Sequence, residues 1–147
     1  MLKLADSNIW LALTLSKHRF HRASRAWLDQ MKADDLVLFC RSTQQSYLRL
    51  LTTAEVLAPY GIAPLSNAEA WAAYEGWLAS GCAAFIDEPR GLDSYWKTLA
   101  VRETSSPKLW MDAYLAAFAM SGGYRLVTTD KGFKQFKSLD LEVLAES

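Results

Sequence analysis

The sequence predicts an α/β fold in which a mainly parallel central sheet is covered by helices on both faces, giving three layers. Short apolar runs that are typical of strands alternate with segments of helical periodicity along the whole chain, and this alternation is typical of parallel sheets. The 147 residues are 51% hydrophobic and 22% charged, and they contain no repeat, low-complexity tract or linker. We therefore expect residues 1–147 to form a single domain around one core.

The N-terminal half of the chain predicts two strands and three helices. Leu2 and Leu4 alternate with a lysine in a first strand that reaches Asp6, and a serine then opens an apolar helix. Ser42 and Gln45 are spaced as a capping box at the start of the third helix. The expected elements are a strand over 2–5, helices over 7–15 and 16–31, a strand over 36–40 and a helix over 42–52.

The C-terminal half predicts three longer helices and three strands. Ser66 and Glu69 form a second capping box, Asp93 is placed to cap the next helix, and Ser106 followed by Pro107 opens the last long helix. The expected elements are helices over 67–80, 94–103 and 107–121, strands over 82–86, 125–129 and 139–144, and a short helical turn over 131–136.

Composition narrows the classes of function. Sixteen basic residues balance sixteen acidic ones, so a polyanionic partner must be held by a local patch or a metal ion. Cys40 and Cys82 are isolated in apolar stretches, which favours free thiols in a reducing cytoplasm over zinc or a disulfide. The N-terminus lacks the pattern of a signal peptide, and the uncharged stretch 113–124 is shorter than the roughly 20 residues of a membrane helix. We expect no association with a membrane.

Three carboxylates stand out. Asp6 and Asp130 each follow a predicted strand, and the carboxyl ends of parallel strands border the crevice in which ligands bind. Asp112 is the only charged residue between 109 and 124, in a helix that is apolar nearly all round. Burial of an unpaired carboxylate costs several kcal/mol, so Asp112 should be protonated, paired or bound to a metal.

Each acid also has a simpler interpretation. Asp6 and Asp130 could be ordinary helix N-caps, and Asp112 could pair with Lys108 or with a buried arginine. Together, three hard oxygen ligands without a nearby cysteine or histidine favour Mg²⁺, with Mn²⁺ as the alternative, and such an ion can assist phosphodiester hydrolysis. An aspartyl-phosphate domain is a third possibility, but it requires a second acid beside Asp6, which the sequence lacks.

Two further features have open roles. A basic segment over 17–25 is either a solvated surface or a patch that binds phosphate near the site; it comprises Lys17, His18, Arg19, His21, Arg22 and Arg25. The aromatic residues Trp71, Tyr74 and Trp77 share a helix at helical spacing and form either core or an interface with a protein partner.

The segments that contain these acids resemble the PIN domain, and within it the VapC-type toxins of bacterial toxin–antitoxin pairs. The matching segments are "LADSNIWLAL", "STQQSYLRLLT", "SSPKLWMDAYLAAFA" and "LVTTDKGF", in family order over almost the whole chain. The resemblance implies a metal-dependent endoribonuclease that cleaves RNA through an Mg²⁺-activated water, is often a homodimer and is neutralised by a cognate antitoxin protein.

The resemblance also assigns roles to residues. Asp6, Asp112 and Asp130 match the acidic metal ligands, and Thr128 and Thr129 match hydroxyl positions before the last acid. Relatives usually carry a second acid, a glutamate, on the middle helix. The best match here is Gln44, with Gln45 and Ser46 as alternative alignments. Gln44 is therefore expected to orient the nucleophilic water, with weaker metal binding than a glutamate would give.

Overall fold

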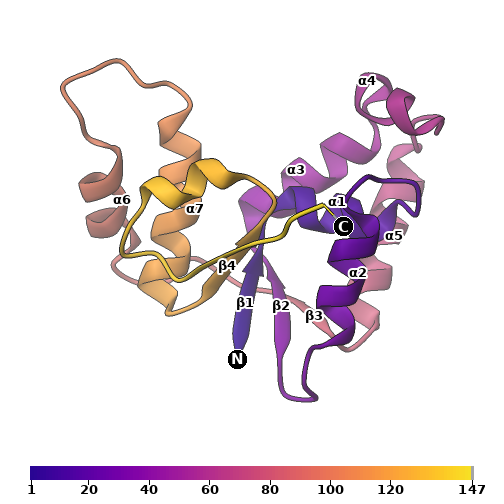
Figure 1. Ribbon diagram of the computed structural model, residues 1–147, viewed down its shortest axis with the longest axis horizontal. Helices are drawn as coiled ribbons and strands as arrows, with labels where there is room; N and C mark the ends of the chain where they lie inside the picture. Colours follow the sequence, from indigo (N-terminus) through magenta and orange to yellow (C-terminus); the bar gives the residue numbers. More distant parts are fainter. Residues whose placement is uncertain (147) are drawn as a thin grey trace.

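A computed structural model describes residues 1–146 and contains one five-stranded, all-parallel sheet. The strands run in the spatial order β3-β2-β1-β4-β5. The first four are labelled in Figure 1. Their bounds are β1 Leu2–Ala5, β2 Leu36–Phe39, β3 Ala83–Phe85, β4 Arg125–Thr128 and β5 Leu141–Val143. The parallel sheet predicted from the sequence is confirmed.

The helices lie on both faces of the sheet, as Figure 1 shows. One face packs against the first five helices, and the other against the last two together with the 3-10 turn η2. The helical elements are α1 Ser7–Thr14, α2 His21–Asp29, α3 Arg41–Leu51, α4 Ala54–Leu57, η1 Ala58–Tyr60, α5 Asn67–Ala79, α6 Leu92–Ala100, α7 Leu109–Gly122 and η2 Lys131–Gln135.

Alternation along the strands divides the core in two. Successive strand residues point to opposite faces, so Leu4 and Leu126 pack under α6 and α7. Phe39 and Val127 face the other way and pack with α1, α3 and α5. On that side, the indole of Trp10 stacks on Phe39 with ring centroids 3.8 Å apart. The two cores cover the two faces of the sheet. Within the sheet, the parallel pairing of β1 with β4 places the carboxyl ends of these strands side by side.

Several predicted helix starts were wrong. Helix α2 begins at His21, and residues 16–20 form turns. Helix α3 begins at Arg41 because the Cys40 N–H donates to Thr43 Oγ1, so the predicted cap at Ser42 lies inside the helix. Gly91, with a φ of 82°, precedes α6 in place of Asp93. Helix α7 begins two residues after Pro107.

Among the other local features, the predicted capping box and the two free thiols are confirmed. The capping box of Ser66 and Glu69 opens α5, and Gly123 ends α7 in the left-handed region. In the aromatic stripe, Tyr74 is buried and Trp77 packs against the core, whereas Trp71 is exposed. Both cysteines are free. No helix within residues 1–146 has the length and apolar character needed to cross a membrane.

Candidate functional site

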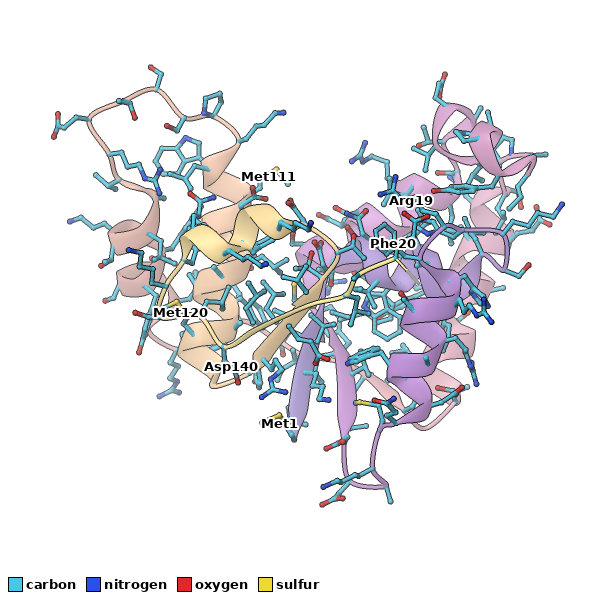
Figure 2. The ribbon with its side chains drawn as sticks, viewed as in Figure 1. Met1, Arg19, Phe20, Met111, Met120 and Asp140 are labelled. Carbon is cyan, nitrogen blue, oxygen red and sulfur yellow. The ribbon has the colours of Figure 1, made fainter. Side chains whose placement is uncertain are left out.

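The three acids selected from the sequence line one pocket at the carboxyl edge of the sheet. Asp6 follows β1, Asp130 follows β4, and Asp112 lies in the first turn of α7. The pocket has a volume of about 380 Å³, and Figure 2 labels one of its residues, Met111, at the upper end of α7. The rest of its wall is Ser7, Ser42, Thr43, Ser46, Lys108, Met111, Leu115 and Phe133.

Asp6 is held in place by hydrogen bonds to both carboxylate oxygens. Its Oδ1 accepts from the Ser7 N–H at 2.8 Å and from Ser7 Oγ at 3.4 Å. Its Oδ2 accepts from Thr128 Oγ1 at 2.7 Å. Asp6 is therefore the N-cap of α1, as the simpler interpretation stated, and it also points a fixed carboxylate into the pocket.

Thr128 connects the first and the last acid. Its side chain is fully buried, and its hydroxyl donates to Asp6 while accepting from the Asp130 backbone N–H at 3.0 Å. One hydroxyl at the end of β4 thus fixes the Asp6 carboxylate and the backbone that presents Asp130. The resemblance indicated this position, but the bridging contact depends on the pairing of β1 with β4.

Asp130 is exposed and caps η2. Its Oδ1 accepts from the Gly132 N–H at 2.8 Å. A Cβ added at Gly132 would lie 3.0 Å from that oxygen, so the glycine leaves room for the carboxylate. The capping interpretation is thus correct for Asp130, and it coexists with a position on the pocket wall.

The three carboxyl groups concentrate negative charge in the pocket, and this affects the pKa values of Asp6 and Asp112. Burial raises the pKa of Asp6, the charges of Asp112 and Asp130 add to the rise, and the hydrogen bonds from Thr128 and Ser7 oppose it. Burial also raises the pKa of Asp112, followed by the charge of Asp130, while Lys108 lowers it. No salt bridge within residues 1–146 involves any of these three acids. A bound cation would relieve this repulsion.

The donor set suits a hard divalent ion. All the charged donors are carboxylates, which Mg²⁺ and Mn²⁺ prefer, and hydroxyls line the wall opposite Asp112. Within the described residues, however, no three Asp, Glu, His or Cys side chains lie close enough to act together as ligands of one ion. Mg²⁺ commonly binds through one or two carboxylates and keeps several waters, so the residues present fit such an ion.

Gln44 does not line the pocket. Its side chain is 5% exposed, and its Oε1 accepts from Arg41 Nη1 at 2.6 Å. Ser46, which the sequence offered as an alternative match, does line the pocket together with Ser42, one turn earlier on α3. The role of Gln44 in orienting water stays a prediction, and of the three candidate matches Gln44, Gln45 and Ser46 only Ser46 lines the pocket.

The sequence interpretation did not assign two polar or polarisable residues to the pocket, although it considered one of them, Lys108, as an ion-pair partner of Asp112. Lys108 and Met111 line the pocket beside Asp112. Their spacing carried a signal, because residues three and four apart share one face of a helix and Lys108 lies four residues before Asp112. Lys108 does not form the ion pair with Asp112 that was considered, yet it is the one basic residue among those that line the pocket, and its charge lowers the pKa of Asp112.

The basic segment over 17–25 contributes no side chain to this pocket. Arg19 pairs with Glu146 at 3.6 Å and Arg25 with Asp29 at 3.1 Å. His21 Nδ1 forms a hydrogen bond with the Ala12 carbonyl at 2.8 Å. Figure 2 places Arg19 and Phe20 away from Met111, toward the α2 side of the molecule. The segment therefore lies outside the immediate site.

Comparison with known proteins identifies the family. The sequence-family model of the PIN domain matches residues 3–139 of this chain. Ribonuclease VapC41 of Mycobacterium tuberculosis is 55% identical over 144 residues, which cover 97% of this chain and 99% of that protein.

Solved structures share the fold. VapBC2 from Rickettsia felis, solved bound to a DNA fragment from its promoter, has a TM-score of 0.71 at 13% identity and covers 99% of this chain and 100% of its own. VapC20 of Mycobacterium tuberculosis, described as a toxin that cleaves the sarcin–ricin loop, has a TM-score of 0.67 at 14% identity with the same coverage. Because the domain model spans most of the chain and VapC41 is more than half identical along nearly its whole length, the chain belongs to the PIN-domain family as a VapC-type protein.

Proposed function

We propose that this protein is a metal-dependent endoribonuclease toxin that cleaves RNA phosphodiester bonds and is neutralised by a cognate antitoxin protein. The observation that carries the proposal is the convergence of Asp6, Asp112 and Asp130 on one pocket. The name of the 55% identical VapC41, a ribonuclease, supports RNA as the substrate. The VapBC complexes among the similar structures support an antitoxin partner.

Asp6 and Asp112 would bind the metal directly, and Asp130 would help to hold it through a bound water or would hold a second ion. Mg²⁺ is the first choice and Mn²⁺ the alternative. Such an ion, when bound, supplies Lewis-acid polarisation of the phosphate and an activated water. The protein side chains prepare the site for it. Thr128 and Ser7 fix the Asp6 oxygens, and Asp130 is oriented by its cap to Gly132.

Lys108 gives the site a way to bind the substrate. It lies on the pocket wall one helical turn before Asp112, and its charge opposes that of the carboxylates. An ammonium group in this position can contact an RNA phosphate while the carboxylates contact the metal. The anionic phosphate and the metal cation would then each meet protein groups of opposite charge. We propose Lys108 as the phosphate contact nearest to the cleaved bond.

The test is cleavage of total RNA by the purified protein with Mg²⁺, with Mn²⁺ and with chelator. We expect discrete, metal-dependent fragments from the wild type and none from Asp112→Asn. Asp93→Asn is the matched control, because Asp93 is an exposed aspartate in the first turn of α6 and lies outside the pocket. Equal loss of activity in both variants would contradict a specific role for Asp112.

A second function has one observation in its favour. No acidic residue of α3 lines the pocket, since Ser42, Thr43 and Ser46 occupy that wall. A site with fewer negative ligands binds metal more weakly, and the protein would then bind RNA or a protein partner without cleavage. Absence of metal-dependent fragments from folded wild-type protein, with RNA binding retained, would favour this alternative.

The partners follow from the same proposal. We propose that the toxin forms a homodimer and that the antitoxin suppresses its activity when the two are produced together. Growth of cells that express the wild type, the Asp112→Asn variant, or the wild type with its cognate antitoxin tests the toxicity and its neutralisation. The wild type alone should arrest growth, and the other two combinations should not.

A further inference from the structure

A second pocket lies on the other side of the first turn of α7 and is not part of the acidic site. It is formed by the loop between α6 and α7, which stands at the upper left of Figure 1, and has a volume of about 430 Å³. We call it the Trp110 pocket. It is lined by Ala100, Val101, Arg102, Thr104, Ser105, Ser106, Pro107 and Trp110.

Trp110 presents an aromatic surface to solvent in a fixed orientation. Its side chain is 52% exposed, and it is the second residue of α7. Trp96 donates its indole N–H to the Trp110 carbonyl at 2.9 Å, and the two rings meet edge to face at 83° with centroids 6.2 Å apart. Val101 lines the same pocket and is 60% exposed, so two large exposed apolar side chains lie together here, and such groups of exposed apolar residues often mark interaction sites.

The Trp110 pocket adjoins the acidic pocket across one helical turn. Trp110, Met111 and Asp112 are consecutive, and each residue turns the helix by about 100°. Trp110 and Asp112 therefore point to opposite sides of α7. Met111 lies between them, is 67% exposed and lines the acidic pocket. A strand bound at the acids needs to pass only over this turn, about 10 Å wide, to reach Trp110.

The polar groups around Trp110 suit an RNA strand better than a protein surface. Arg102 is held by a hydrogen bond from its Nη2 to Gln135 Oε1 at 3.2 Å, which ties the pocket to η2 beyond Asp130. Thr104 and Ser106 supply hydroxyls, 3.3 Å from each other. Glu103 is the one acid in the loop. An aromatic face beside a cation, here Arg102, and hydroxyls is a common platform for unpaired bases.

We propose that Trp110 stacks on a nucleobase of the RNA substrate, close to but not at the cleaved bond, with Arg102 beside that nucleotide. This proposal rests on the ribonuclease function proposed above and adds a determinant of which sites in RNA are cut. Because the base must be unpaired to reach the indole, the proposal requires the RNA beside the cleaved bond to be single-stranded or looped.

The experiment compares Trp110→Ala and Trp110→Phe with Trp71→Ala, a control tryptophan on α5 that is 47% exposed and lines neither the acidic pocket nor the Trp110 pocket. KM and kcat are measured on a short single-stranded oligoribonucleotide that the wild type cleaves. Loss of one stacked base should raise KM about 5- to 150-fold in Trp110→Ala, whereas Trp110→Phe and Trp71→Ala should stay within a few-fold of the wild type.

The affinity for the oligonucleotide, measured in an Asp112→Asn background, separates the proposed stacking by Trp110 from the proposed ribonuclease activity. If Asp112→Asn binds the oligonucleotide and addition of Trp110→Ala weakens binding by the same factor, stacking is supported independently of cleavage. If the wild type cleaves RNA but Trp110→Ala and Trp71→Ala have equal KM values, only the stacking proposal fails. Dissociation of a dimer by Trp110→Ala, with KM unchanged, would assign this surface to a second copy and overturn the proposal.

Discussion

At the scale of single residues, Thr128 has the most consequential contacts in the site. Replacement by valine keeps the shape but removes the donor to Asp6 and the acceptor of the Asp130 N–H. Unmade buried hydrogen bonds cost about 1–3 kcal/mol each. We expect Thr128→Val to lower stability by an amount of this order and to reduce kcat/KM at least tenfold, measured by denaturant unfolding and by RNA cleavage.

The pH profile distinguishes positioning from simple destabilisation. The Thr128 hydrogen bond lowers the pKa of Asp6, so its removal should move the acidic limb of the activity profile to higher pH. Thr128→Ser, which keeps the hydroxyl, should restore the wild-type profile. An unchanged profile in the valine variant would contradict the role of this hydroxyl in tuning Asp6.

Two substitutions on α3 test which position corresponds to the glutamate that relatives usually carry there. Ser46 lines the pocket, so Ser46→Glu should bring a fourth carboxylate to the metal and tighten Mg²⁺ binding by about tenfold, as calorimetry would measure. Gln44→Glu is the matched change two residues earlier, and its new charge would face Arg41. If Gln44→Glu tightens binding and Ser46→Glu does not, the assignment from the sequence alignment is correct.

At the scale of elements, the sequence located the acids better than it located the helix starts. Strand ends are marked by a change from apolar to acidic residues, so Asp6 and Asp130 could be placed by pattern alone. The start of α3 could not, because a threonine hydroxyl and the Cys40 N–H form the cap where a serine was expected. Each residue turns a helix by about 100°, so an uncertain alignment on α3 changes which side chain faces the acids.

Two glycines provide a paired test of the helices. Gly76 lies inside α5 with open space around its Cβ position, so Gly76→Ala should stabilise the protein by about 0.5–1 kcal/mol. Gly123 ends α7 at a φ of 71°, which side chains rarely adopt, so Gly123→Ala should destabilise it by about 1 kcal/mol. Denaturant unfolding measures the change in the free energy of unfolding for both variants. If both changes had the same sign, the left-handed conformation of Gly123 would not constrain the end of α7.

At the scale of the whole molecule, the site is a product of the topology. Asp6 and Asp130 lie together because β4 pairs with β1 in parallel, although the two residues are far apart in sequence. The alternation of strands and helices predicted this meeting. The Trp110 pocket was not predictable in the same way, because it depends on the path of the loop over 101–108 and on the packing of Trp96 against α7.

The charge in the pocket makes stability depend on pH and on metal. Asp112 has a raised pKa in the folded state, so folding favours its protonated form. The wild type should lose stability as the pH rises through that pKa, while below the ordinary value of 3.8 both states are protonated and the effect disappears. Without metal, Asp112→Asn should therefore have a higher Tm than the wild type at pH 7, with the difference shrinking toward pH 4.

Metal should reverse that order. A ligand that binds only the folded state stabilises it in proportion to the logarithm of its concentration, so Mg²⁺ should raise the Tm of the wild type. At ten times Kd the gain is about 1.4 kcal/mol, which corresponds to a few degrees for a chain of this length. Asp112→Asn should respond much less, and Asp93→Asn should respond as the wild type does. A wild-type Tm that is insensitive to millimolar Mg²⁺ and Mn²⁺ would count against a metal held by these carboxylates, whether or not RNA is bound.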